Sequence, residues 1–302
     1  MERFAVFILV LATVATVAAQ KRYRNDYVYD PNTDAFYKFH VNMAVHWRAL
    51  TICKLEGATL MVPTSVQRIA QVHGMFKQYP DIGHYVWIGD DNADHESAEE
   101  TPIIDLQPEV ETEAPWEERC MVLTRRGEIQ TQNCRYYQSF VCMVEAKNAP
   151  YDHRCDVYAA GYEYNTDVKS CYKIPRDIKT WNAAYAECQA HGAHLVVVNS
   201  VTERDVLQAL MGRTPSAEGT SFSPYYYIAG IRATSGIGSE VVYRTIFNET
   251  LEEAGFSEWA DNEPNNQQGI EYCGSLHQRS GKYNDISCLS SFEYICEKER
   301  NE

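Results

Sequence analysis

The sequence predicts an α+β chain made of two homologous units, each with two helices, small antiparallel sheets and a long-loop region. Three observations support this fold class. Cysteines recur at nearly the same spacings in both halves of the chain, helix signals open each half, and short strand signals close it. The length of 302 residues also corresponds to about two domains.

The repeat is clearest in the cysteine spacing. Each half has a cysteine that is followed by Gly, Leu and Ser at offsets of four, seven and twelve residues, Cys53 in the first half and Cys188 in the second. Two more cysteines stand eight residues apart near the end of each half, at positions 134 and 142 and at positions 288 and 296. Such coincidences indicate two copies of one unit. The joint between them is expected near residues 144–154.

Helix signals occupy the first part of each copy. Thr64 to Gln67 has the Gln form of the capping box, in which two side chains satisfy free N–H groups at the helix start. In the second copy Thr180 can cap a helix that ends at Gly192. Ser200 to Glu203 is a further capping box, and it opens a second helix.

Strand signals follow the helices. Trp87 to Gly89 forms one such run in the first copy, and Tyr225 to Ile231 and Glu293 to Cys296 form two in the second. Aromatic and β-branched residues of this kind favour strands. Long turn-rich stretches lie between them, and such stretches are uncommon in compact domains unless they have a function.

The amino terminus indicates export. Phe4 to Val17 is apolar but too short for a comfortable membrane span, and small residues precede Gln20. We therefore expect a signal peptide at residues 1–19 and a secreted, extracellular protein. Ten cysteines fit that oxidising route.

Charge restricts the class of partner. The formal net charge of −15 argues against nucleic acid and disfavours adsorption to anionic membranes. Much of the excess lies in Asp90 to Glu118, which holds twelve acidic residues and no Lys or Arg. This segment is expected to be a solvated loop, and a docking surface for a basic partner is the alternative.

Catalytic patterns are absent from the sequence. It contains no His-Glu-x-x-His, no Gly-x-Ser-x-Gly and no Gly-Lys phosphate loop. His191 and His194 are three residues apart, but no Cys or further His is placed to complete a zinc shell. We expect no enzyme, and we expect these histidines to be ordinary residues at a helix end.

Oxygen-bearing side chains gather near the last cysteines. Glu263-Pro264-Asn265 is followed by Glu271 just before Cys273 and by Asn284-Asp285 just before Cys288. Calcium takes 6–8 oxygen ligands and accepts an irregular shell built from loops. Glu263-Pro264-Asn265 alone could be an exposed polar turn. All five positions together, Glu263, Asn265, Glu271, Asn284 and Asp285, predict a calcium site, and Pro264 is a candidate for a cis peptide bond.

The helices, the Trp87-Ile88-Gly89 strand, the nested cysteines and the Glu-Pro-Asn site together resemble the C-type lectin-like domain, in two copies. The tandem arrangement is similar to insect immulectins. The resemblance implies a short-form domain with a degenerate calcium site at residues 20–147 and a long-form, mannose-type domain at residues 148–302. It also implies five disulfides: Cys53–Cys142, Cys120–Cys134, Cys155–Cys171, Cys188–Cys296 and Cys273–Cys288.

In this family Glu-Pro-Asn accompanies mannose, glucose or N-acetylglucosamine. The resemblance thus implies a lectin of hemolymph-like fluid that recognises microbial polysaccharide or lipopolysaccharide in innate immunity. Glu263, Asn265, Glu271, Asn284 and Asp285 would bind both Ca²⁺ and the sugar. A structural, ice-binding or protein-binding role on the same fold is the alternative, since a fold does not fix function. A calcium-dependent hydrolase is a more remote one.

The first copy departs from this pattern. Gln107-Pro108-Glu109 resembles the galactose-type motif, and Glu118 stands two residues before Cys120 as Glu271 does before Cys273. Gln130-Thr131, however, replaces Asn284-Asp285. We expect one competent site per chain, so useful avidity on a microbe needs self-association into a homo-oligomer.

Three smaller features complete the prediction. Asn248-Glu249-Thr250 is an N-glycosylation acceptor. Tyr283 stands where the family usually has Trp, which should affect packing more than coordination. Asn266 and Tyr272 stand where an auxiliary calcium site usually has acidic ligands, so no second ion is expected there.

Overall fold

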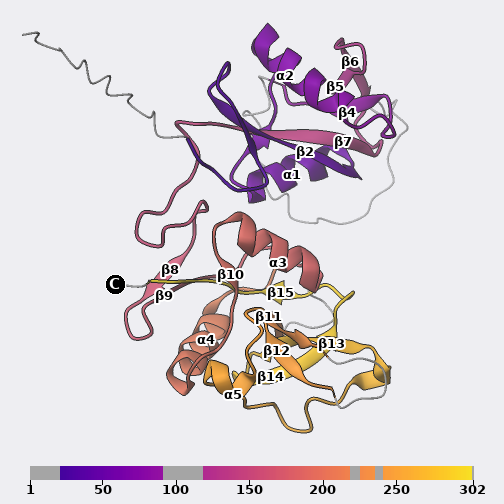
Figure 1. Ribbon diagram of the computed structural model, residues 1–302. Coiled ribbons are helices and arrows are strands. Elements are labelled where there is room, and N and C mark those ends of the chain that lie inside the picture. Colours follow the sequence, from indigo (N-terminus) through magenta and orange to yellow (C-terminus); the bar gives the residue numbers. More distant parts are fainter. Residues whose placement is uncertain (1–20, 91–117, 218–224, 235–240, 301–302) are drawn as a thin grey trace, which may run out of the picture.

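The computed structural model describes residues 21–90, 118–217, 225–234 and 241–300. Figure 1 shows two α+β halves stacked along the chain, one built from β1 to β7 and the other from β8 to β16. The signal peptide expected at residues 1–19, Gln107-Pro108-Glu109 and most of the acidic stretch lie outside the described residues. None of the described helices is long and apolar enough to cross a membrane.

The amino-terminal half has one seven-stranded sheet in the order β1-β2-β7-β4-β5-β6, with β3 also paired to β7. The β4–β7 pair is parallel, and the other pairs are antiparallel. Its elements are β1 (Val28–Asp30), β2 (Ala35–Ala44), α1 (His46–Leu55), β3 (Thr59–Leu60), α2 (Val66–Lys77), β4 (Tyr85–Trp87), β5 (Arg119–Thr124), β6 (Ile129–Asn133) and β7 (Gln138–Glu145).

The carboxy-terminal half divides its strands between a four-stranded sheet, β10-β16-β9-β8, and a five-stranded sheet, β12-β11-β13-β14 with β15 on β11. Its elements are β8 (Glu163–Asn165), β9 (Ser170–Lys173), α3 (Trp181–Ala190), β10 (His194–Leu195), α4 (Val201–Arg213), β11 (Tyr226–Ala233), β12 (Tyr243–Thr245), α5 (Leu251–Ala254), the 3₁₀ turn η1 (Gln267–Gly269), β13 (Glu271–His277), β14 (Tyr283–Ser287), β15 (Glu293–Tyr294) and β16 (Cys296–Glu299).

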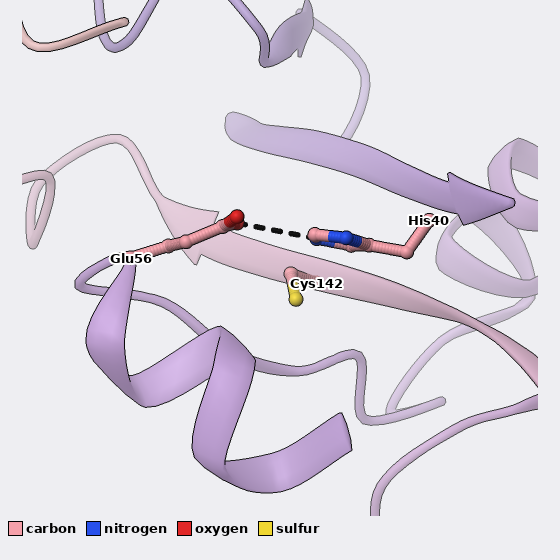
Figure 2. A group of neighbouring side chains, drawn as sticks. All are labelled: His40, Glu56 and Cys142. Atoms are coloured by element: carbon pink, nitrogen blue, oxygen red, sulfur yellow. Dashed lines mark hydrogen bonds and ion pairs between the residues drawn. The ribbon is translucent and has the colours of Figure 1, made fainter. Parts of the chain in front are cut away.

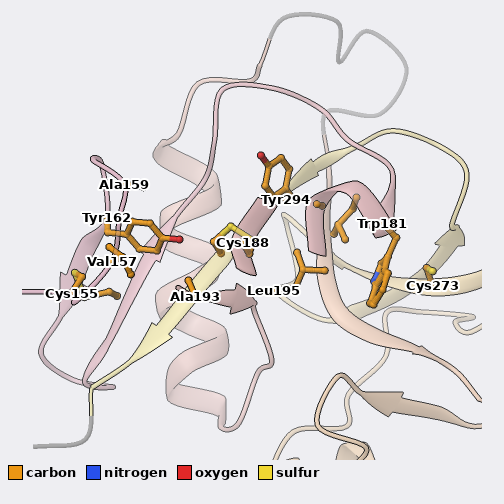
Figure 3. Packing of buried hydrophobic residues seen from close by; sticks show 14 of the residues in the cluster. Cys155, Val157, Ala159, Tyr162, Trp181, Cys188, Ala193, Leu195, Cys273 and Tyr294 are labelled. Atoms are coloured by element: carbon orange, nitrogen blue, oxygen red, sulfur yellow. A yellow bond between two sulfur atoms is a disulfide. The ribbon is translucent and has the colours of Figure 1, made fainter. Parts of the chain in front are cut away.

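Disulfides pass through both cores. The five bonds join the pairs that the resemblance implies: Cys53–Cys142, Cys120–Cys134, Cys155–Cys171, Cys188–Cys296 and Cys273–Cys288. In Figure 3 the Cys188 bond lies among buried side chains that include Leu195, Trp181 and Tyr294. The Trp181 indole donates to Ala229 O at 2.9 Å, and Trp87 donates to Ala44 O at 2.9 Å in the other half. A buried indole N–H needs such a partner.

The helix starts differ in detail from the predicted capping. Ser65, not Thr64, is the N-cap of α2, and its hydroxyl accepts from Arg68 N. Thr180 is the N-cap of α3 but makes no side-chain cap bond. Ser200 does accept from Glu203 N. The reciprocal bond of that box is missing, because the Glu203 carboxylate accepts from Asn199 N and from the Tyr172 hydroxyl.

Strand boundaries also differ. The predicted strand at Glu293 to Cys296 is divided between β15, which pairs with β11, and β16, which pairs with β9 and β10. The chain thus changes sheets at Ile295, which is buried.

A segment before β1 connects the two halves. Arg24 is 1% exposed and donates to Asp26 at 3.0 Å and to Glu187 of α3 at 2.7 Å. Asn25 reaches the end of the same helix, donating from Nδ2 to Gln189 O at 3.3 Å. The ion pairs lower the pKa of Asp26 and Glu187 against the opposing effect of burial. Both carboxylates therefore stay charged at the junction.

A buried carboxyl pair lies in the carboxy-terminal core. Glu203 of α4 and Glu297 of β16 are both fully buried, and Glu297 Oε1 has no hydrogen-bond partner. Burial first, and Glu203 second, raise the pKa of Glu297 well above 4.5. The folded state therefore holds this proton more tightly than the unfolded chain, so stability falls as the pH rises above 4.5.

Glu297→Gln is expected to raise the melting temperature at pH 8 in calcium-free buffer by several degrees, and by less at pH 5. Gln keeps an acceptor for Val197 N, which donates to Glu297 at 3.2 Å, and carries no charge. Relieving a buried unsatisfied group is worth about 1–3 kcal/mol. Glu299→Gln, exposed on the same strand, is the matched control. Equal melting shifts at both pH values would contradict the raised pKa of Glu297.

Candidate functional site

The five predicted ligands lie around the hairpin of β13 and β14. Asn284 and Asp285 are consecutive in β14 and pair with Ser275 and Gly274 of β13. Glu271 is the first residue of β13, and Glu263 and Asn265 lie in the loop before it. The Glu263–Pro264 peptide bond is cis. The hairpin thus fixes three of the positions, and the loop brings the other two to its edge.

Asp285 holds the loop against the hairpin. Its side chain is almost fully buried and accepts from Asn265 N at 3.1 Å and from Asn266 N at 2.7 Å. The Tyr243 hydroxyl of β12 donates to the same carboxylate at 3.2 Å. These bonds place Asp285 at the centre of the group, where it orients the residues that follow Pro264.

The two more exposed carboxylates, Glu263 and Glu271, also form hydrogen bonds within this group. Glu263 accepts from Asn265 Nδ2 at 2.9 Å, so the two outer side chains of the motif form one unit. Glu271 accepts from Gln267 N at 2.9 Å, and its own N–H donates to the Asn266 side chain at 2.9 Å. Asn284 Nδ2 donates to the backbone oxygen of Asp285. All five predicted residues are therefore joined by one hydrogen-bond network.

Negative charge is concentrated in this network. None of its carboxylates forms an ion pair with a described Lys, Arg or His side chain. Burial, and then Asp285, raise the pKa of Glu263 to about 7, and burial and Asp285 also raise the pKa of Glu271. Three carboxylates with two amide oxygens and no cationic side chain are a donor set that fits a hard dication such as Ca²⁺.

The three carboxylates do not form a compact cluster. The ligand atoms of Glu263, Glu271 and Asp285 do not all lie within 4.8 Å of one another. Calcium–oxygen distances are about 2.3–2.6 Å, so ligands on opposite sides of one ion stand about 5 Å apart. Amide oxygens from Asn265 and Asn284 can occupy the positions between them.

A tighter group in the other half does not fit a metal. Among the described residues, His40, Glu56 and Cys142 have their possible ligand atoms within 4.8 Å of one another (Figure 2). The Cys142 sulfur is bonded to Cys53, so it offers no thiolate. Glu56 already accepts from Tyr27 at 2.7 Å and pairs with Lys38. This cluster is a structural hydrogen-bond group.

The equivalent site of the amino-terminal half carries a cation of its own. Thr131 of β6 stands where Asp285 stands in the other half. Arg119 of β5 donates to the Thr131 hydroxyl at 3.0 Å and to its backbone oxygen at 3.0 Å. A guanidinium at this place would repel a bound dication. Sequence reasoning found the missing Asp but not Arg119, although its position directly before Cys120 was a signal.

Three supporting residues were also missed. Tyr243 touches Asp285, Trp259 lies 4.8 Å from the Tyr243 ring, and Asn266 bonds to both Asp285 and Glu271. Tyr283, expected to act in packing, is fully buried against Phe256 and Trp259. The Tyr283 hydroxyl accepts from Val198 N at 3.2 Å.

The histidines predicted to be ordinary are in polar contacts of the fold. His191 lies 3.0 Å from Glu187 and 3.1 Å from the Tyr162 hydroxyl, and burial lowers its pKa. His194 contacts Leu195 O at 2.9 Å. Asn248, the predicted glycosylation acceptor, is exposed after β12. Glycosylation of Asn248 remains a prediction.

The sequence comparison decides the family. The Lectin C-type domain matches residues 44–144 and again residues 177–298. The chain belongs to the C-type lectin domain family. This membership agrees with the expected fold, with the repeat and with the expectation that the chain is a binding protein and not an enzyme.

Two curated relatives place this C-type lectin domain protein among known proteins. A hemolymph lipopolysaccharide-binding protein of Periplaneta americana is 39% identical over 140 residues, which are 46% of this chain and 52% of the relative. The human C-type mannose receptor 2 is 22% identical over 283 residues, which are 89% of this chain and 18% of the receptor. The chain thus spans about half or less of the length of these relatives.

Two solved structures of C-type lectins align with part of the chain. The carbohydrate-recognition domain of the mouse scavenger receptor C-type lectin aligns with a TM-score of 0.37 and 20% identity, covering 47% of this chain and 97% of that domain. A complex of SPL-1 with GlcNAc aligns with a TM-score of 0.38 and 23% identity, covering 50% of this chain and all of that one.

Proposed function

We propose that the chain is a secreted lectin whose carboxy-terminal half binds mannose-type glycans of microbial surfaces in a calcium-dependent manner. The observation that carries this proposal is the hydrogen-bond network that joins Glu263, Glu271 and Asp285 at the Glu-Pro-Asn loop, where none of the three carboxylates has an ion pair with a described cationic side chain. The 39% identity to a hemolymph lipopolysaccharide-binding protein supports a microbial ligand and an extracellular fluid.

The roles of the residues follow from their contacts. Asp285 and Asn284 are nearly buried and form the base of the site, whereas Glu263 and Asn265 stand at its outer edge. When bound, Ca²⁺ supplies coordination positions that two neighbouring sugar hydroxyls can occupy. Glu263 can accept hydrogen bonds from these hydroxyls, and the Asn265 amide can also donate. The pair therefore selects a sugar by the orientation of its two neighbouring hydroxyls.

The proposal restricts binding to one half of the chain. Arg119 and Thr131 replace the anionic base of the site in the amino-terminal half. A single sugar site is weak, so binding to a microbe is expected to depend on several chains acting together. We include self-association in the proposed function for this reason.

Retention of the full chain on mannose-agarose tests this function. We expect retention in millimolar calcium, elution by EDTA and by free mannose, and no elution by galactose. Extracellular calcium sites often have dissociation constants of about 10⁻⁴–10⁻³ M, which sets the concentration required. If the chain passes through the column without retention whether or not calcium is present, the proposal is contradicted and a structural, ice-binding or protein-binding role is favoured.

A further inference from the structure

A groove lies between the two halves, away from the calcium-site loop. It has a volume of about 1140 Å³ and is lined by β2 and α1 on one side and by α3 and the segment after β9 on the other. In Figure 1, α1 and α3 face each other across this junction. None of the five predicted calcium ligands lines it. The groove is therefore separate from the proposed sugar site.

The groove is rich in cations although the chain is strongly acidic. Six Lys and Arg side chains line it, against four carboxylates, in a chain with a net charge of −15. The six are Lys38, Arg48, Lys54, Lys173, Arg176 and Lys179. A local excess of positive charge within an acidic protein is an electrostatic feature that can select an anion.

All four carboxylates of the groove are already paired. Asp26 lies 2.9 Å from Arg24, and Glu187 lies 2.7 Å from the same guanidinium. Glu56 pairs with Lys38, and Asp177 lies 2.7 Å from Lys179. The other four cations of the groove, Arg48, Lys54, Lys173 and Arg176, form no ion pair among the described residues. They come in equal number from both halves.

Lys173 is the most constrained of these four cations. It ends β9, where it pairs with Cys296 of β16, and its side chain is partly buried. Its ammonium lies 5.9 Å from the centre of the Tyr162 ring. Burial lowers the pKa of Lys173, and Glu187 acts in the opposite direction without reaching ion-pair distance. An anionic ligand would supply the missing partner.

We propose that this groove binds a glycan that carries a phosphate group. Lys173 and Arg176 contact the anion from the carboxy-terminal half, and Arg48 and Lys54 contact it from α1. A phosphate monoester carries a charge of about −1.5 to −2 at pH 7, which matches the surplus of cations, and Arg and Lys both bind phosphate. A long polyanion fits less well, because the acidic surface beyond the groove repels it.

The volume of the groove indicates a ligand larger than the anion alone. Small-molecule sites usually measure about 300–1,000 Å³. The exposed side chains of Val41 and Leu55 also line the groove and can cover the carbon face of a sugar ring. The phosphate would thus be held by the four cations while the attached sugar lies on the aliphatic part of the wall.

Isothermal titration calorimetry of the full chain tests the proposal. Glucose 1-phosphate, inorganic phosphate and glucose are the three probes, in buffer freed of calcium over a chelating resin, because EDTA is itself a polyanion. We expect glucose 1-phosphate to bind most tightly, inorganic phosphate more weakly, and glucose not at all. Equal affinity for the two phosphates would overturn the glycan assignment, and no binding of either would overturn the site.

Two groove variants and one matched control locate the binding. Lys173→Gln with Arg176→Gln, and separately Arg48→Gln with Lys54→Gln, are each expected to weaken glucose 1-phosphate binding at least tenfold. The second pair is exposed on α1, so it carries little risk of misfolding. Arg126→Gln with Arg279→Gln removes the same charge outside the groove and should change affinity less than twofold.

An equal loss in the control pair would overturn the proposal, since it would reduce the effect to net charge. Thermal melting of each variant confirms the fold, and mannose-agarose retention in calcium is measured separately. A groove variant that keeps calcium-dependent retention but loses phosphate binding distinguishes this site from the proposed sugar site. Failure of mannose retention in the wild-type chain leaves the phosphate measurement interpretable.

Discussion

Asp285→Asn is expected to abolish calcium-dependent retention on mannose-agarose, with at least a tenfold loss of calcium affinity, or about 1.4 kcal/mol. The carboxylate accepts from Asn265 N, Asn266 N and the Tyr243 hydroxyl. An amide offers one acceptor oxygen in place of two and turns an N–H₂ group toward these donors. The substitution therefore removes a charged ligand and also loosens the loop that carries Glu263 and Asn265.

Fluorescence of Trp259 provides a direct calcium measurement. Trp259 lies against the Tyr243 ring, which contacts Asp285 through its hydroxyl. We expect calcium to change the emission of the wild-type chain and to have a much smaller effect on Asp285→Asn. Asp167→Asn, at an exposed carboxylate in the same half, should titrate like the wild type. Undiminished mannose retention by Asp285→Asn would remove the calcium site from the proposed mechanism.

The fold was largely predictable because the cysteines recur at regular spacings and are joined by disulfide bonds. Cysteine spacing separated the copies, and the family resemblance implied the five pairs that form. Boundaries were less predictable, because alternative hydrogen bonds compete at helix ends. Ser65, not Thr64, is the cap, and the only capping box with both bonds among the described helices, Thr250 with Glu253, was not predicted.

Some residues of the candidate site could also be predicted from the sequence, and others could not. The sequence identified the five candidate oxygen ligands by their positions, since each has a fixed offset from a cysteine or from Pro264. It did not identify Tyr243 of β12 and Asn266 of the loop before β13, which reach Asp285 of β14 only in the folded chain. The interdomain groove was also beyond sequence reasoning. Its cations come from β2, α1, β9 and the segment after β9, which the fold alone brings together.

Glu263→Gln combined with Asn265→Asp is expected to move sugar preference from mannose toward galactose. The two side chains are joined by the bond from Asn265 Nδ2 to Glu263 Oε1, at 2.9 Å. In the double variant the amide at position 263 can donate to the carboxylate at position 265, so the bond reverses while charge and size are kept. The loop is therefore expected to keep its shape, and the pattern of donors and acceptors offered to a diol is exchanged.

Competitive elution separates this effect from a general loss of binding. The double variant should be released from the column by galactose at a concentration at least about tenfold below one that leaves the wild type bound, which corresponds to at least about 1.4 kcal/mol of altered preference. Glu263→Gln alone is the matched control. It places two amides side by side and removes one of the three carboxylates, so it should weaken binding of both sugars together. Unchanged mannose selectivity in the double variant would mean that Glu263 and Asn265 do not determine which sugar binds, even if Asp285 binds the calcium ion.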